Sequence, residues 1–285
     1  MKRGANKMVS AICLDLDGTL LNDDKIINEK TIETLKRTYL RGVKIIIATG
    51  RQYSVAKEML SCLEFPLFII YSNGAGVRLS TSDEHFFYHY LQAPLYADVM
   101  QLAKDLPLGI MINVDCFKTG PDMFWFAGKH DKYIKAYARN NSIRAKLLSD
   151  LSILPDKALS LVFIGLISDL LLLEDKVQRN NLECNFHTMK NSGTMSLFEI
   201  MHFSGEKGCA LRRLAKYLRL DIRNIVSFGD DTNDIGMLND SGLSFAMKNG
   251  IEEVKIISNK ITDKDNNHDG VAVELNKLLS LGMEF

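Results

Sequence analysis

The chain has 285 residues, which exceeds the roughly 100–200 residues of a common single domain, so one large domain or two smaller ones are expected. Lysine plus arginine (35) equals aspartate plus glutamate (35), so there is no net basic field to bind nucleic acid or an anionic membrane surface. The five cysteines are scattered, odd in number and without a C-x-x-C pair, which predicts reduced thiols in a cytoplasmic protein and argues against a disulfide framework or a zinc site.

The first predicted element is a short apolar strand, Val9–Leu14, followed by the carboxylates of Asp15 and Asp17. Such a run is typical of a strand that is buried on both faces and has its polar end at the rim of a sheet. The same two carboxylates interrupt the apolar stretch after the basic N-terminus, so no secretion signal is predicted. Any chemistry that these carboxylates perform is therefore expected at the rim of the sheet.

The next elements predict a repeating alternation of helices and strands. A helix is expected to begin at Asn28 and to end at Gly42, and Val43–Ala48 follows it as a second buried strand. Another helix, about Ser54–Cys62, leads to the strand Leu67–Tyr71. This alternation implies a parallel sheet with right-handed crossovers, in which ligands bind at the carboxyl ends of the strands.

From about residue 84 to 189 the pattern changes to mixed strands and helices with clustered aromatic side chains. We interpret 84–189 as an inserted α+β domain, so that the core consists of 1–83 and 190–285. The most apolar segment, Ala158–Leu173, is shorter than the roughly 20 residues of a membrane span and contains Asp169. It is predicted to be a buried strand that runs into a helix, and no membrane association is expected.

Two acidic segments lie at predicted strand ends. Asp15 and Asp17 follow the first strand, and Gly229–Asp234 follows a short strand, Ile225–Phe228, in the second part of the core. Carboxylates a few ångströms apart share a proton or bind a hard cation. Each segment alone is also compatible with ordinary turn chemistry, because aspartate and glycine are common in turns. Asp231 receives no role from this pattern.

Two further polar segments could hold an anion. Thr49 follows the second strand, so its hydroxyl and the backbone N–H groups of Gly50 and Arg51 could meet an anionic oxygen. Lys207 lies between glycines, ahead of a helix predicted to begin at Cys209, and provides a positive charge. Taken separately, these segments resemble a turn and a solvated helix start. The four polar segments in this order predict phosphoryl transfer.

In these four segments the chain resembles the haloacid dehalogenase-like (HAD) hydrolase superfamily, and specifically its Cof-type (type IIB) phosphatases. The matching motifs, in order, are Asp15–Leu21, Ala48–Arg51, Glu206–Leu211 and Gly229–Met237. The resemblance implies an α/β fold: a Rossmann-like doubly wound parallel sheet core with an inserted α+β cap domain that sets substrate specificity. It also implies a hydrolase that acts on phosphoric monoester bonds and requires Mg²⁺.

The resemblance further implies a role for each matched residue. Asp15 would be the nucleophile that forms an aspartyl-phosphate, Asp17 the general acid and base, and Lys207 the third catalytic residue. Magnesium would be bound by Asp15, the backbone carbonyl of Asp17 and Asp230, and Asp234 would orient Lys207 or a metal-bound water. The residues expected to bind the phosphate or the substrate are Leu16, Thr49, Gly50, Arg51, Asn73, Lys207 and Asn233.

The expected substrate is a small phosphorylated metabolite, such as a sugar phosphate or a cofactor phosphate. Its identity would be set within the insertion, where the candidate residues are His89, Trp125, His130, Arg139, Arg144 and His187. Two alternatives remain open. One is a phosphomutase of the same fold, for which Arg139 and Arg144 could form a second phosphate site, and the other is a non-catalytic module that binds phosphometabolites. The sequence predicts neither the particular phosphomonoester nor the oligomeric state.

Overall fold

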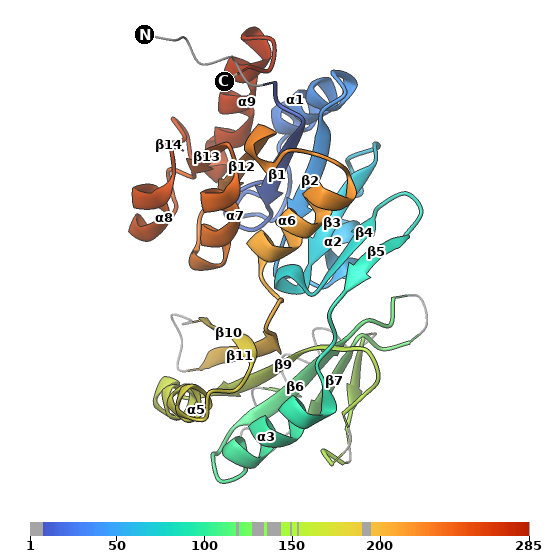
Figure 1. Ribbon diagram of the computed structural model, residues 1–285, viewed down its shortest axis with the longest axis vertical. Helices are drawn as coiled ribbons and strands as arrows, with labels where there is room; N and C mark the ends of the chain where they lie inside the picture. Colours follow the sequence, from blue (N-terminus) through green and yellow to red (C-terminus); the bar gives the residue numbers. More distant parts are fainter. Residues whose placement is uncertain are drawn as a thin grey trace. The chain divides into compact units, whose positions relative to one another are not determined.

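The computed structural model folds into two compact units, which Figure 1 shows as a ribbon. The first unit is built from Met1–Tyr88 and Glu206–Phe285, and the second is His89–Gly205. The structure describes residues 8–117, 120–126, 134–135, 144–148, 150–152, 154–189 and 195–284. Among these residues, no helix combines the length and apolar character needed to cross a membrane.

The first unit is organised around an eight-stranded sheet with the order β14-β13-β12-β1-β2-β3-β4-β5. The strands from β14 to β3 are parallel to their neighbours, whereas β4 and β5 add to one edge in antiparallel fashion. The predicted parallel core is confirmed, with an antiparallel extension that was not expected. The strands are β1 (Ala11–Asp15), β2 (Lys44–Ala48), β3 (Leu67–Tyr71), β4 (Gly76–Leu79), β5 (His85–Tyr88), β12 (Ile225–Gly229), β13 (Leu243–Ala246) and β14 (Lys260–Ile261).

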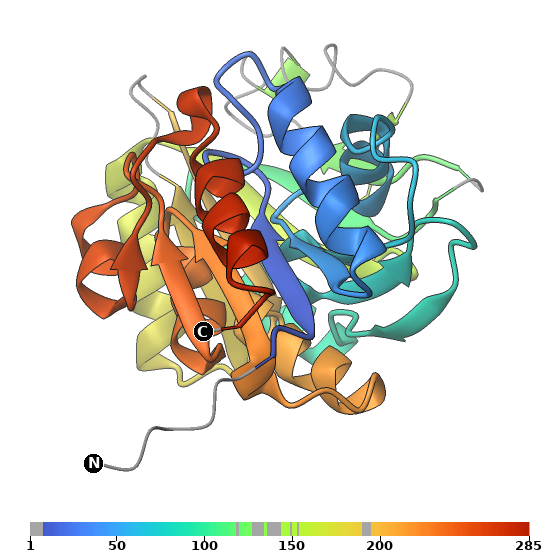
Figure 2. The same cartoon turned by 90° about the horizontal axis from the view of Figure 1, so that it is seen from above.

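Helices cover both faces of this sheet. On one face, Ala11 and Cys13 of β1 belong to a buried apolar cluster that also takes in residues of α6, α7 and α8. Successive strand residues point to opposite faces, so Ile12 and Leu14 are buried on the other face. There α1 and α9 pack against each other, as Figure 2 shows. The helices of this unit are α1 (Glu29–Leu40), α2 (Tyr53–Met59), α6 (Lys207–Tyr217), α7 (Ile235–Asp240), α8 (Glu252–Ile257) and α9 (Gly270–Ser280).

The second unit has its own six-stranded sheet, with the order β10-β11-β9-β6-β7-β8. All neighbouring strands are antiparallel except β7 and β8. Helices α3 and α5 pack over one face around a buried apolar cluster that includes Phe163 and Phe198. The elements are α3 (Ala93–Ala103), β6 (Gly109–Val114), β7 (Met123–Phe126), β8 (Ala145–Leu147), β9 (Ala158–Gly165), α5 (Ile167–Arg179), β10 (Cys184–Met189) and β11 (Ser196–His202).

The boundaries of the two units differ from the predicted 83/84 and 189/190. Strand β5, which carries part of the aromatic cluster, pairs with β4 in the first sheet, and Phe87 packs into the core of that unit. Strand β11 pairs with β9 from Ser196 to Met201, so it belongs to the second unit. A run with strand character indicates burial but does not identify the sheet that buries it, which explains both differences.

Candidate active site

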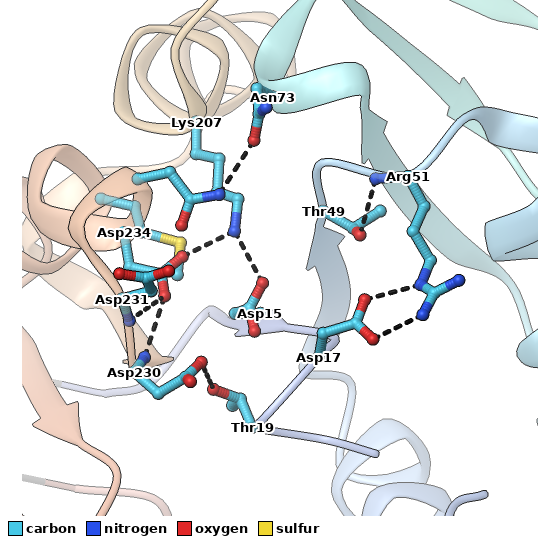
Figure 3. A network of polar contacts seen from close by, with 12 residues as sticks. Asp15, Asp17, Thr19, Thr49, Arg51, Asn73, Lys207, Asp230, Asp231 and Asp234 are labelled. Atoms are coloured by element: carbon cyan, nitrogen blue, oxygen red, sulfur yellow. Dashed lines mark hydrogen bonds and ion pairs between the residues drawn. The ribbon is translucent and has the colours of Figure 1, made fainter. Parts of the chain in front are cut away.

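The predicted polar residues follow neighbouring strands of the first sheet. In the parallel register, Leu14 lies beside Phe228 and Asp15 lies beside Ala48, so β12, β1 and β2 end at nearly the same level. The residues that follow these strands therefore gather at one edge, although they are far apart in the chain. Figure 3 shows the resulting network of polar contacts, which includes Asp15, Thr49 and Asp230.

At the centre of this network lies a buried ammonium between two carboxylates. Lys207 Nζ donates to Asp15 Oδ1 at 2.6 Å and to Asp234 Oδ1 at 2.7 Å, and all three side chains are buried. Lys207 is the first residue of α6, which begins two positions before the predicted Cys209. Burial opposes the charged form of Lys207, but the two carboxylates outweigh it and raise the pKa of Lys207. The ammonium is therefore held in a fixed, charged position.

The acidic segment after β12 is organised by its own backbone. Asp234 Oδ2 accepts from the N–H groups of Asp230 at 2.9 Å and Asp231 at 3.1 Å. The Asp231 side chain accepts from the N–H of Thr232 at 2.7 Å and completes a capping box with Asp234. Asp231, which had no predicted role, thus caps the short helix Thr232–Asp234.

Asp15, Asp230 and Asp234 form a group that fits a hard divalent cation. Each offers a carboxylate oxygen, and the three oxygens lie within 4.8 Å of one another. With Lys207 as the counter-charge, the group keeps two formal negative charges. Asp15 Oδ2 is buried and has no hydrogen-bond partner within the described part of the chain. Within the part of the chain that the structure describes, this group does not include the Asp17 carboxylate.

Two of these carboxyls, Asp15 and Asp230, have raised pKa values, because both are buried beside other carboxylates. Burial raises the pKa of Asp15 well above its usual range, against the attraction of Lys207. Burial also raises the pKa of Asp230 to about 6, and repulsion from Asp234 adds to the shift. A bound cation would relieve both penalties, because an opposite charge favours the ionised form of a carboxyl.

Two residues of the turn after β1 set the position of the Asp230 side chain: Thr19 contacts it, and Gly18 leaves room for it. Thr19 Oγ1 donates to Asp230 Oδ1 at 3.1 Å, and the Asn249 side chain donates to the Gly18 carbonyl at 2.7 Å. Gly18 has a φ of +78°, and a Cβ on it would lie 2.3 Å from Asp230 Oδ2. Neither Thr19 nor Asn249 was a predicted site residue. Thr19 stands in the first motif, whereas Asn249 lies outside the four motifs.

Gly18→Ala is expected to weaken divalent metal binding, because the new methyl group would displace the Asp230 carboxylate. Gly42→Ala is the matched control: its φ is +84°, but a Cβ there meets nothing within 4 Å. Both variants should lose about 1–2 kcal/mol of unfolding free energy from the left-handed backbone. Titration with MgCl₂ followed by calorimetry should show reduced affinity for Gly18→Ala alone. Equal metal affinity in the two variants would contradict this account of Gly18.

The Asp17 carboxylate is held by two cationic side chains. Arg51 donates from Nε to Asp17 Oδ2 at 2.6 Å and from Nη2 to Asp17 Oδ1 at 2.6 Å, and Lys25 Nζ lies 3.0 Å from Oδ1. Burial alone would raise the pKa of Asp17, but the hydrogen bonds from Arg51 and Lys25 outweigh it and lower this pKa. Lys25 was not a predicted site residue, and Arg51 was predicted to contact substrate rather than Asp17.

The remaining predicted phosphate contacts lie in the turns after β1, β2, β3 and β12. Thr49 is buried, and its Oγ1 accepts from the Arg51 N–H at 3.1 Å. Asn233 Nδ2 donates to Asn73 Oδ1 at 3.0 Å, which joins the turns after β12 and β3. A Cβ on Gly50 would come within 3.0 Å of that same Asn73 oxygen. Leu16 directly follows Asp15, and its side chain is fully buried, so it offers only backbone groups to a ligand.

The candidate residues of the second unit have separate local environments. His89 stacks on His202 with ring centroids 4.8 Å apart, and Trp125 and His187 lie on β7 and β10. Arg144 Nε and Nη2 both donate to Asp122 Oδ2, at 2.8 and 2.5 Å. His130 and Arg139 lie outside the described residues. The structure therefore ties Arg144 to a neighbouring carboxylate of its own unit.

Comparison with known proteins gives consistent matches. A sequence model of the haloacid dehalogenase-like hydrolases matches residues 12–275. The chain is 28% identical over 270 residues to the 5-amino-6-(5-phospho-D-ribitylamino)uracil phosphatase YitU of Bacillus subtilis, covering 95% of this chain and 97% of that protein. It is 28% identical over 248 residues to the HMP-PP phosphatase of Escherichia fergusonii, 87% of each. The crystal structure of a haloacid dehalogenase-like hydrolase from Bacteroides thetaiotaomicron shares the fold, with a TM-score of 0.79, 24% identity, and coverage of 95% and 99%.

Proposed function

Because this chain belongs to the haloacid dehalogenase-like hydrolases, we propose that it is a magnesium-dependent phosphatase of small phosphomonoesters. The observation that carries the proposal is the buried contact of Lys207 with Asp15. Among the residues that the structure describes, the second oxygen of Asp15 has no hydrogen-bond partner, and it lies beside two further carboxylates. A carboxylate that is fixed by one oxygen and unbonded at the other is suited to nucleophilic attack.

The proposed reaction has two steps at phosphorus. Asp15 forms a bond to phosphorus while the bond to the leaving oxygen breaks, and Asp17 gives that oxygen a proton. Water then attacks the aspartyl-phosphate and loses a proton to Asp17, which releases phosphate and restores both carboxyl groups. One residue can serve both steps because the second step returns the proton that the first one used.

Charge on the transferring phosphoryl group would be stabilised by fixed groups around Asp15. We assign this role to Lys207, the Thr49 hydroxyl, the Asn233 amide and the backbone N–H groups of the turn that begins at Leu16. Asp15, the backbone carbonyl of Asp17 and Asp230 would hold Mg²⁺, with Asp234 beside them. The cation would supply charge neutralisation between the carboxylates and the anionic phosphate.

The proposed substrate class is a small phosphorylated metabolite, either a sugar phosphate or a cofactor phosphate. Relatives named as an aminouracil-derivative phosphatase and an HMP-PP phosphatase support this class. The second unit is proposed to be the cap that selects the leaving group. A phosphomutase is less well supported, because Arg144 is paired with Asp122. A cytoplasmic location is proposed from the five free cysteines.

Magnesium-dependent release of phosphate from an aryl phosphate is the expected result for the wild-type protein. Asp230→Asn should lower the apparent magnesium affinity at least about 10-fold, since even groups that only support metal ligands contribute this much. Asp263→Asn is the matched control, because Asp263 is exposed and paired with Lys277. Phosphate release that is unchanged by EDTA would contradict the proposed metal dependence. A panel of phosphomonoesters ranked by kcat/KM would then identify the substrate.

A further inference from the structure

The cations around Asp15 and Asp17 differ sharply in their exposure to solvent. The Lys207 side chain is 1% exposed and lies between two buried carboxylates. The Arg51 and Lys25 side chains are 29% and 50% exposed, and Asp17 is 35% exposed. A buried ion pair is costly to break, whereas a fully solvated pair contributes at most about 1 kcal/mol. The Asp17 contacts lie between these cases, because Arg51, Lys25 and Asp17 are all partly exposed. They are therefore less costly to exchange than the Asp15 contact.

In the structure, cations occupy both carboxylate oxygens of Asp17. Arg51 binds Oδ1 and Oδ2 together, while Lys25 binds Oδ1 only. To act on a leaving group or a water molecule, Asp17 must have an oxygen available to it. Departure of Arg51 would free Oδ2 and leave Lys25 in place on Oδ1. Arg51 therefore controls whether Oδ2 of Asp17 is available.

Arg51 is also placed to meet a phosphate. It belongs to the same turn as Thr49, whose hydroxyl accepts from the Arg51 backbone N–H, and Figure 3 shows its guanidinium reaching from this turn to Asp17. Guanidinium groups bind phosphate through two parallel hydrogen bonds, as they bind carboxylate. A phosphomonoester dianion carries more charge than a carboxylate, so it can compete with Asp17 for the same guanidinium.

We propose that Arg51 exchanges partners when substrate binds, leaving the Asp17 carboxylate for the phosphate group and thereby making Asp17 Oδ2 available for proton transfer. This inference rests on the proposed phosphatase function. Arg51 is then a phosphate ligand in the complex and a positioning residue for Asp17 in the free protein. Asp17 thus becomes available for proton transfer when an anionic substrate binds Arg51.

The test is a double-mutant cycle on the binding of inorganic phosphate, measured by calorimetry in saturating MgCl₂. Asp17→Asn removes the competitor for Arg51, so it should tighten phosphate binding about 3- to 5-fold. Arg51→Gln should weaken binding about 10-fold, as expected for loss of a charge-assisted bidentate contact. In the Arg51→Gln background, Asp17→Asn should change the affinity less than 2-fold, because there is no guanidinium left to release.

The matched control is Asp24→Asn, which removes an exposed negative charge one residue from Lys25 and should leave phosphate affinity unchanged. If Asp17→Asn increases phosphate affinity equally with and without Arg51, its effect is general charge repulsion. That result would overturn the proposed exchange. Absence of phosphate binding by the wild-type protein would overturn it as well. If Asp17→Asn fails to fold, the same cycle is run with Asp17→Ser.

The assay of phosphate release keeps the two proposals apart. Suppose that the wild-type protein releases phosphate from esters and that the two substitutions act additively on phosphate binding. This result would overturn the exchange but would leave the phosphatase proposal intact. A non-additive cycle without release from any ester would support the exchange and contradict the phosphatase proposal. Arg51→Lys adds a further check: it keeps the charge but loses the bidentate contact, so its phosphate affinity should lie between those of wild type and Arg51→Gln.

Discussion

Replacing Asp15 with asparagine is expected to reduce kcat for phosphate release by roughly 10⁴-fold or more, the loss typical of removing a catalytic nucleophile. The amide has nearly the same shape as the carboxylate but cannot form the bond to phosphorus. The fold should survive, because Lys207 keeps its contact with Asp234 and the number of buried like charges falls. The measurement is steady-state hydrolysis of an aryl phosphate, with thermal unfolding of each protein as a check on folding.

Asp231→Asn is the control for this experiment, since it makes the same chemical change on an exposed carboxylate close to the site. Asparagine caps helices about as well as aspartate, so stability should hardly change. Turnover by Asp231→Asn should therefore stay close to that of the wild-type protein. Comparable turnover by Asp15→Asn and the wild-type protein would remove Asp15 from the role of nucleophile.

Replacing Lys207 with methionine is expected to lower the free energy of unfolding by about 3–5 kcal/mol. The variant leaves Asp15 and Asp234 buried without the ammonium that both contact in the structure. Denaturation by urea at neutral pH, in the absence of divalent metal, measures the loss. Added MgCl₂ should restore part of it, because a cation bound by the three carboxylates would replace some of the missing charge.

The control for Lys207→Met is Arg179→Met, which removes a cation that pairs with Asp175 within α5. Both side chains of this pair are exposed, so the loss should cost no more than about 1 kcal/mol. Equal losses in the two variants would mean that burial adds nothing to the Lys207 contacts. In that case the fixed position that we assign to this ammonium would be wrong.

Local patterns were sufficient to predict the strands that carry the site. The apolar runs before Asp15 and Thr49 were recognised as buried strands, and Leu67–Tyr71 was predicted with its observed bounds. These predictions succeed because a strand buried on both faces needs a continuous apolar run, which is visible in the sequence. The start of α6 was placed two residues late, because glycine ordinarily weakens a helix. In the structure Gly208 lies in the first turn of α6, where a Cβ would come 2.6 Å from the backbone of Gly236.

Other features could not be predicted from local patterns. The run that forms β5 was assigned to the insertion, because its aromatic residues indicate burial without naming a partner strand. The contact of Asn249 with Gly18 joins two loops far apart in the chain, and an asparagine in a polar loop carries no signal of its target. Such side-chain contacts depend on how the strands are ordered in the sheet, which local periodicity does not encode.

The sequence by itself determined the chemistry available at the rim of the sheet: carboxylates after two strands, a hydroxyl after a third, and a lysine ahead of a helix. Only the tertiary structure decided how these groups are divided among partners. It buries Lys207 between Asp15 and Asp234, and it leaves Arg51 and Lys25 on Asp17 in partial contact with solvent. The reason is physical. The strength of an ion pair depends on distance and burial, and both are set by the packing of segments that the sequence keeps apart.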